Sequence, residues 1–96
     1  MKVTVDYLGY IKGVLGVKQP EVVVLKDNAQ VRDLLAALAE KHGAPFKKAV
    51  YEPNSSDLKP TYIMSINGLL LNQLKELDTN LKDGDQVVLL PIVTGG

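Results

Sequence analysis

The chain has 96 residues, 46% of them hydrophobic, and its eleven basic residues balance its eleven acidic ones. This length supports one domain with its own core, and a balanced charge provides no electrostatic basis for binding nucleic acid or an anionic membrane. Cysteine is absent, which excludes disulfides, thiolate nucleophiles and sulfur-rich metal sites. If the protein handles sulfur, no side-chain thiol carries it.

The beginning of the chain lacks the basic start and apolar stretch of a signal peptide. We therefore expect a cytoplasmic protein. The longest apolar run, residues 87–93 with Pro91 inside it, is far shorter than the roughly 20 residues that a membrane-spanning helix needs.

Two strands are predicted in the first quarter of the chain. Residues 2–8 alternate apolar and polar side chains, the period of a half-buried strand, and residues 21–25 are mostly β-branched. We expect these strands to pair antiparallel. Between them, Gly9, Gly13 and Gly16 have a spacing that fits neither a dinucleotide nor a phosphate loop, and the stretch is predicted to be a mobile connection.

One main helix is predicted from residue 30 to residue 42. Its apolar positions recur with helical spacing, and charged residues cover the opposite side. These positions are Val31, Leu34, Leu35, Leu38 and His42. Asn28 is a candidate N-cap, and Gly43 stands where a helix ends. A helix with one apolar stripe covers only one face of a sheet.

Residues 46–60 are predicted to be less regular than the helix before them. Phe46, Val50 and Tyr51 are expected to place a short turn on the core, followed by a surface loop over residues 52–57.

A hairpin and a last strand are predicted in the remaining third of the chain. Residues 61–66 are predicted to form a strand, Asn67-Gly68 is a strong hairpin signal, and residues 69–71 are predicted to form a short strand that pairs with the first. Asp83-Gly84-Asp85 then turns the chain into a fifth strand, residues 86–90.

This order of elements predicts an α+β domain with a mixed five-stranded sheet and one main helix packed on one face. Residues 87–90 are apolar on both faces, as central parallel strands are, which fits pairing beside the first strand. The other face would carry either Val87 and Leu89 or Val88 and Leu90, with part of the leucine run 69–71. An uncovered apolar face is predicted to be a docking surface. In the alternative, residues 44–60 fold over it.

Residues 92–96 are predicted to be a flexible C-terminal tail that follows the domain of residues 1–91. Pro91 has no N–H to donate to a sheet ladder, so strand pairing is expected to end there. Counted from Pro91, six residues extend over about 20 Å, enough to reach into another protein's active site. Gly95 and Gly96 make the end of this tail thin and conformationally permissive.

The side chains offer no catalytic constellation of their own. His42 is the only histidine and falls at the end of the predicted helix, where a cation near the last carbonyls is a common structural feature. Asp83 and Asp85 flank a glycine, which is typical of a turn rather than of a metal site. We therefore expect no catalysis by this chain alone and no metal or cofactor bound to it.

One pattern of residues carries a family resemblance together with the strand order and the Asn67-Gly68 hairpin. The pattern is Asp83-Gly84-Asp85-x-Val87-x-x-x-Pro91-x-Val93-x-Gly95-Gly96. In these features the whole chain resembles the ubiquitin-like β-grasp sulfur carriers of the MoaD/ThiS family, and its ending is most similar to the small subunit of molybdopterin synthase. It departs from them in having Ile92 where a second proline is usual, and in being longer between Gly43 and Pro60.

The resemblance implies a β-grasp fold and a role as a sulfur carrier. In the family, an activating enzyme related to that of ubiquitin uses ATP and magnesium to adenylate the terminal carboxylate, and sulfur then replaces AMP to give a thiocarboxylate. Gly96, preceded by Gly95, would be the reactive end and a substrate, with ATP and magnesium held by the activating enzyme. The residues assigned to partner binding are Leu70, Leu90, Pro91, Ile92, Val93 and Thr94.

Three functions remain open. The first is sulfur donation in molybdopterin (molybdenum cofactor) biosynthesis, with the large subunit of molybdopterin synthase or another sulfur acceptor as partner; thiamine or tRNA thiolation is a variant of it. The second is a ubiquitin-like modifier joined through Gly96 to lysines. The third is a β-grasp interaction module that works only through its exposed sheet face. Deleting Gly95-Gly96 would abolish the first two functions and leave the third.

Overall fold

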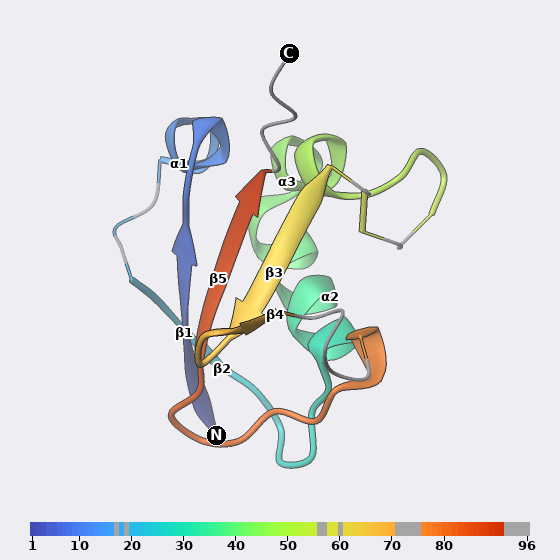
Figure 1. The fold of residues 1–96 in the computed structure, drawn as a ribbon. Helices are drawn as coiled ribbons and strands as arrows, with labels where there is room; N and C mark the ends of the chain where they lie inside the picture. The colour runs from blue at the N-terminus through green and yellow to red at the C-terminus, as the bar shows by residue number, and fades with distance from the viewer. Residues whose placement is uncertain (17, 19, 56–57, 60, 71–75, 92–96) are drawn as a thin grey trace.

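The structure, a computed structural model, describes residues 1–16, 18, 20–55, 58–59, 61–70 and 76–91. These ranges contain five strands, three α-helices and a short 3₁₀ turn, η2 (Figure 1). In chain order the elements are β1 (Lys2–Tyr7), α1 (Tyr10–Leu15), β2 (Glu21–Val24), α2 (Val31–His42), α3 (Ala44–Val50), β3 (Tyr62–Ile66), β4 (Leu69–Leu70), η2 (Glu76–Asp78) and β5 (Gln86–Pro91).

The strands form one mixed sheet in the order β2-β1-β5-β3-β4. The last strand lies at its centre: β5 runs parallel to β1, with Val87 opposite Val5, and antiparallel to β3, with Leu89 opposite Met64. β1 and β2 pair antiparallel. The predicted α+β class with a mixed five-stranded sheet is therefore confirmed, as is the pairing of the first strand with the last.

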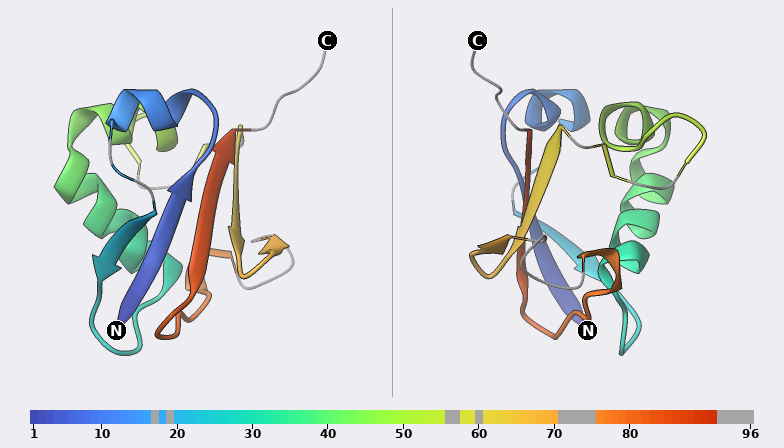
Figure 2. Two further views of the ribbon diagram at one scale, coloured as in Figure 1. Left: turned by 90° about the vertical axis from the view of Figure 1, so that its left-hand side faces the viewer. Right: turned by 45° about the vertical axis from the view of Figure 1, so that its right-hand side comes forward.

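The helices lie on one side of the sheet, with α2 as the main one and α3 packed against both α2 and α1 (Figure 2). Side chains alternate along each strand, so one set enters the core beneath the helices. The largest fully buried side chains are Tyr7, Phe46, Ile11, Leu34, Leu35, Leu38, Met64 and Leu89. Each contributes about 1.5–3 kcal/mol relative to an exposed position, so this layer holds the helices on the sheet.

The glycine-punctuated stretch after β1 is helical, so its prediction as a mobile connection was wrong. Ile11 of α1 is fully buried, and Gly16 ends the helix in the left-handed conformation with its N–H donated to the Lys12 carbonyl oxygen at 3.1 Å. Gly13 inside the helix costs about 1 kcal/mol relative to alanine. Burial of Ile11 contributes about 1.5–3 kcal/mol, which more than offsets that cost.

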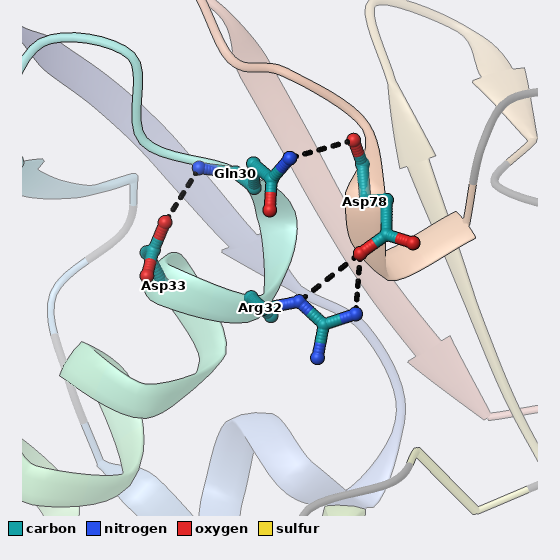
Figure 3. Close-up of polar contacts among 4 residues, drawn as sticks. All are labelled: Gln30, Arg32, Asp33 and Asp78. Carbon is teal, nitrogen blue, oxygen red and sulfur yellow. Dashed lines mark hydrogen bonds and ion pairs between the residues drawn. The ribbon is translucent and has the colours of Figure 1, made fainter.

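The N-terminus of α2 is capped by Gln30, so the prediction of Asn28 as N-cap was wrong. The Gln30 N–H donates to Asp33 Oδ2 at 2.8 Å, and the Gln30 side chain accepts from the Asp33 N–H, which forms a capping box. Gln30 Nε2 also donates to the Asp78 carbonyl oxygen at 3.2 Å, and the Arg32 guanidinium pairs with the Asp78 carboxylate (Figure 3). These contacts fasten the start of α2 to η2.

Residues 44–50 form α3 on the side of the sheet that α2 occupies (Figure 2). Phe46 and Val50 are fully buried and Tyr51 is 9% exposed, which confirms that this stretch lies on the core. Because α3 packs against α2 and α1, it does not cover the opposite face, and the alternative in which residues 44–60 fold over that face is not what the described residues adopt.

The hairpin and the end of the last strand follow the sequence closely. Asn67 and Gly68 have φ values of 51° and 87°, as a two-residue hairpin turn requires, and join β3 to β4. β5 extends one residue further than predicted, because Pro91 lies opposite Tyr62 as its last residue. A proline fits there since it lacks only an N–H. Within the described ranges, no helix is both long and apolar enough to cross a membrane.

Candidate functional site

The sheet face opposite the helices is partly apolar. Val87 and Leu89 are fully buried on the helix side, so Val88 and Leu90 of β5 lie on the opposite face, where both are half-buried. This decides between the two sets of β5 residues that the sequence left open. The other apolar residues of this face are Val22, Val24, Ile63 and Leu70. We call this set, with Val88 and Leu90, the open face; no described helix lies over it (Figure 2).

The predicted partner-binding residues Leu70 and Leu90 both belong to the open face. Leu70 lies opposite Ser65, which lies opposite Val88, and Leu90 lies opposite Ile63. Strand spacings of about 4.8 Å and rises of about 3.3 Å per residue place Leu70 and Leu90 about 12 Å apart. One partner surface can therefore contact both. Pro91, also predicted to bind partners, is the last residue of β5. The remaining predicted partner-binding residues, Ile92, Val93 and Thr94, and the predicted reactive end, Gly95 and Gly96, lie outside the described part of the chain.

Pro91 is the last residue of β5, at the end of the sheet where α1 lies (Figure 1). Gly9, the residue before α1, lies directly against Pro91. A Cβ on residue 9 would lie 2.7 Å from Pro91 Cγ and 2.9 Å from Pro91 Cδ. The Leu8 N–H donates to the Leu89 carbonyl oxygen at 3.0 Å and keeps the chain alongside β5 up to this point. We call Gly9 and Pro91 the tail root. Sequence reasoning missed Gly9, because nothing in its neighbourhood distinguishes it from an ordinary loop glycine.

Two tyrosines border the tail root. Tyr62 is buried opposite Pro91, and its ring centroid lies 6.2 Å from that of Tyr10, the first residue of α1. Burial, and next the neighbouring Tyr10, raise the pKa of the Tyr62 hydroxyl well above its usual value. Tyr62 therefore adds no charge here. With Leu8 47% and Tyr10 59% exposed, the surface beside the tail root is apolar and aromatic.

The turn before β5 is structural, as the sequence suggested. Asp85, only 8% exposed, accepts from Asn67 Nδ2 at 2.9 Å through Oδ1 and from the Lys82 N–H at 2.8 Å through Oδ2. Asn67 Oδ1 in turn accepts from the Gln86 N–H at 2.9 Å. This network fastens the turn of the β3–β4 hairpin to the start of β5.

The Asp83 carboxylate also accepts a hydrogen bond from the backbone. Its Oδ1 accepts from the Lys2 N–H at 2.7 Å, and the Gly84 N–H donates to the Lys2 carbonyl oxygen at 2.7 Å. Both aspartates stand at the opposite end of β5 from Pro91, and strand geometry places Asp85, the nearer one, about 20 Å away. Their position therefore gives them no access to chemistry at the tail root.

A buried carboxylate links the core strands to the end of α2. Glu21, 5% exposed, accepts from the Tyr7 hydroxyl at 2.6 Å and from Lys41 Nζ at 2.7 Å, and His42 Nε2 lies 3.0 Å from both of its oxygens. Burial alone would raise the pKa of Glu21, but the hydrogen bonds from Lys41, Tyr7 and His42 outweigh it and lower the pKa. Burial and the Glu21 carboxylate raise the pKa of Tyr7.

His42 thus takes part in a hydrogen-bonded cluster around Glu21 on the helix side of the sheet, away from the open face. Sequence reasoning missed Glu21, although one signal was present: strand alternation places it on the same side as buried Val23. Among the residues that the structure describes, no group of three or more His, Cys, Asp or Glu side chains is arranged to hold a metal ion.

Comparison with known proteins shows both the fold and the family. Solved structures similar to this chain include three proteins. They are small archaeal modifier protein 1 from Haloferax volcanii (23% identity, TM-score 0.84, 100% of both chains covered), small archaeal modifier protein 1 from Methanosarcina acetivorans (27% identity, TM-score 0.76, 99% of this chain and 96% of that chain), and a putative molybdopterin converting factor, subunit 1, from Pyrococcus furiosus (29% identity, TM-score 0.72, 96% of this chain and 98% of that chain).

The predicted β-grasp fold is confirmed by these similarities. No curated protein sequence matches the chain. The sequence profile of the ThiS family matches residues 5–96, which include the open face, the tail root and Gly95-Gly96. The chain therefore belongs to the ThiS family and is a ubiquitin-like sulfur carrier protein by family.

Proposed function

We propose that the protein is activated at the carboxylate of Gly96 and donates sulfur in molybdopterin biosynthesis. The observation that carries this proposal is the match to the ThiS family, which extends to Gly95-Gly96. The 29% identity to a protein described as a putative molybdopterin converting factor, subunit 1, favours the pterin pathway. The arrangement of β5 supports the same function, because a central strand of the sheet ends at Pro91, five residues before Gly96.

The chemistry requires an activated acyl group, because a carboxylate is a poor electrophile. An oxygen of the Gly96 carboxylate attacks the α-phosphorus of ATP, and pyrophosphate leaves. Hydrosulfide then attacks the acyl carbon, the bond between that carbon and the AMP oxygen breaks, and AMP departs with the electron pair. The product is a thiocarboxylate, so a chain without cysteine carries sulfur at its end.

In this scheme the chain is a substrate and its partners are enzymes. ATP and magnesium belong to an adenylating enzyme related to that of ubiquitin, and the sulfur acceptor is the large subunit of molybdopterin synthase. The open face, through Leu70 and Leu90, and Pro91 at the tail root provide the contacts that both partners use. Two terminal glycines leave no Cβ to obstruct a nucleophile at the acyl carbon.

The test is the intact mass of the purified protein after incubation with its cognate activating enzyme, ATP, magnesium and sulfide. We expect the mass increase that accompanies replacement of oxygen by sulfur, located in the C-terminal peptide. Reactions without ATP, and a variant that lacks Gly95-Gly96, serve as controls and should show no increase. An unchanged mass, with an enzyme that adenylates another carrier in parallel, would reject the proposal.

A second candidate is a protein modifier, favoured by the 27% identity to a small archaeal modifier protein. Here the ε-amine of a lysine attacks the same activated carbonyl, and an isopeptide bond forms as the leaving group departs. We expect conjugates of high mass in cell extracts that survive reducing agent. Their absence, together with co-purification of a molybdopterin synthase subunit, would leave the carrier function alone; co-purification of a thiamine or tRNA-thiolating enzyme would redirect it.

A further inference from the structure

We propose that Gly9 is a positioning residue: its missing side chain sets the direction in which the chain leaves β5 at Pro91, and so determines how efficiently the activating enzyme accepts the C-terminal carboxylate. The inference rests on the proposed function, since it concerns the same activation step. It assigns a role to a residue that neither contacts the reacting atoms nor belongs to the open face.

The backbone of Gly9 excludes other residues for two independent reasons. Its φ of 76° and ψ of −156° lie in a region that is essentially restricted to glycine. In addition, the Cβ of any L-residue would lie 2.7 Å from Pro91 Cγ and 2.9 Å from Pro91 Cδ, closer than the 3.0 Å below which real Cβ contacts essentially do not occur. A side chain at position 9 must therefore displace one of the two segments.

Pro91 is the less restrained side of this contact. The segment around Gly9 is held by the hydrogen bond from the Leu8 N–H to the Leu89 carbonyl oxygen at 3.0 Å, and by that from the Lys12 N–H to the Gly9 carbonyl oxygen at 3.2 Å. Fully buried Ile11 anchors the helix that follows. Pro91, in contrast, is the last residue of its strand and has no N–H to bond. A Cβ at position 9 is expected to push the proline.

A small rotation at Pro91 reaches the carboxylate when an enzyme holds the tail extended, because an extended tail has no slack to absorb the change. If the enzyme binds six residues extended over about 20 Å, a rotation of about 10° at the proline moves the far end by roughly 3.5 Å. Misplacement of reacting atoms by about 1 Å can lower a rate by about 100-fold. The clash involves Gly9 and Pro91 and no residue of the open face, so we expect the enzyme to keep its contacts with the open face while the adenylation rate falls.

The experiment measures ATP–pyrophosphate exchange with the full-length protein as substrate. Gly9→Ala should lower kcat by at least about 10-fold while KM for the protein stays within about two-fold. Gly16→Ala is the matched control, because Gly16 also has a positive φ, 60°, but nothing lies within 4 Å of the point that its Cβ would occupy. It should change kcat by less than about two-fold.

Pro91→Ala removes the two ring atoms that the new methyl group would meet. In this background, Gly9→Ala should lower kcat by less than about three-fold. Equal kcat values for Gly9→Ala and Gly16→Ala, or an undiminished effect of Gly9→Ala in the Pro91→Ala background, would overturn the inference. If Gly9→Ala does not fold, the double variant decides. Folding and activation at the level of Pro91→Ala support the contact. A failure to fold means that the backbone conformation of Gly9, and not its contact with Pro91, excludes a side chain there, and it overturns the inference.

These outcomes are separate from failure of the proposed function. If the unaltered protein supports no exchange with an active cognate enzyme, adenylation at Gly96 itself is rejected. If the unaltered protein is adenylated and Gly9→Ala matches it, only the role of Gly9 is rejected.

Discussion

Glu21 illustrates how much of this small fold depends on a single side chain. Its carboxylate accepts a hydrogen bond from Tyr7 of β1 and pairs with Lys41 and His42 at the end of α2, all from the first position of β2. Because the group is only 5% exposed, loss of the carboxylate would remove hydrogen bonds made in the interior, at about 1–3 kcal/mol. The side chain therefore joins β1, β2 and the end of α2.

Glu21 is expected to make stability depend on pH. Its pKa in the folded protein is lowered from the ordinary value of 4.5, so the unfolded chain takes up the proton first as the pH falls. The contribution of Glu21 is therefore complete above about pH 4.5 and is lost as the pH falls through the folded pKa. Urea unfolding of Glu21→Gln should show a loss of about 1–3 kcal/mol near pH 7 that shrinks towards pH 3. A loss that is equal at both pH values would contradict this.

At the residue scale, the sequence predicted which side of a strand a residue faces better than which distant residues it contacts. Alternation in residues 2–8 placed Val3, Val5 and Tyr7 on one side, and all three are fully buried. Tyr7 and His42 lie 14 and 21 residues from Glu21, and no periodicity in the sequence joins positions that far apart. The same limit hid the contact of Gly9 with Pro91, which exists only once β1 and β5 lie side by side.

At the element scale, the turn before β5 joins the β3–β4 hairpin to the start of β5 and has a structural role. Asp85 is buried and joins the hairpin turn to β5, whereas Asp83 receives one exposed backbone N–H. The two aspartates of this short motif are therefore expected to contribute differently to the stability of the fold. The motif is needed for the fold at one end of β5, while the other end of that strand presents the tail root.

This difference gives a second prediction. Asp85→Ala should lower the free energy of unfolding by about 1–3 kcal/mol, because it leaves Asn67 Nδ2 and the Lys82 N–H without their buried acceptor. Asp83→Ala, the matched control two residues away, should cost less than about 1 kcal/mol, since water replaces the carboxylate at the Lys2 N–H. Chemical denaturation of both variants at one pH measures the contrast. A larger loss for Asp83→Ala would show that the burial of Asp85 does not decide the outcome.

The elements were predicted from sequence where periodicity was strong and missed where glycine interrupted it. The stripe of α2 and the alternation of β1 gave both elements within a residue or two of their bounds. In α1, Ile11, Val14 and Leu15 have helical spacing, but three glycines at positions 9, 13 and 16 pointed to a loop. Burial of Ile11 against the neighbouring elements stabilises the helix despite its glycines. This packing is a tertiary effect, which local sequence patterns do not predict.

For the whole molecule, the position of β5 determines how the parts cooperate. It is bonded on both sides, to β1 and to β3, whereas β2 and β4 are at the edges. The apolar run 87–90 predicted this central place, because a strand covered on both faces carries few polar residues. Val88 and Leu90 on the open face are only half-buried, so no described helix of the domain covers the second apolar face of this strand.

Hydrogen exchange should follow this arrangement. The slowest amides of β5 and β1 are expected to exchange only when the whole domain unfolds, because both strands are paired on two sides. The slowest amides of β4, which has one neighbour and two exposed leucines, should exchange through local opening, at a rate that responds weakly to low denaturant. Strong denaturant dependence in β4, equal to that of β5, would mean that the sheet opens only as one unit.

The central place of the last strand also bears on synthesis at the ribosome. A nascent chain emerges from its N-terminal end, so β1 and β3 leave the exit tunnel before the strand that joins them. Thr4 cannot pair with Gln86 before β5 has been made. Until then, no strand connects the β1–β2 pair to the β3–β4 hairpin. The open face and the contact between Gly9 and Pro91 can therefore form only after residue 91 has been translated. An unfinished chain therefore presents neither of them.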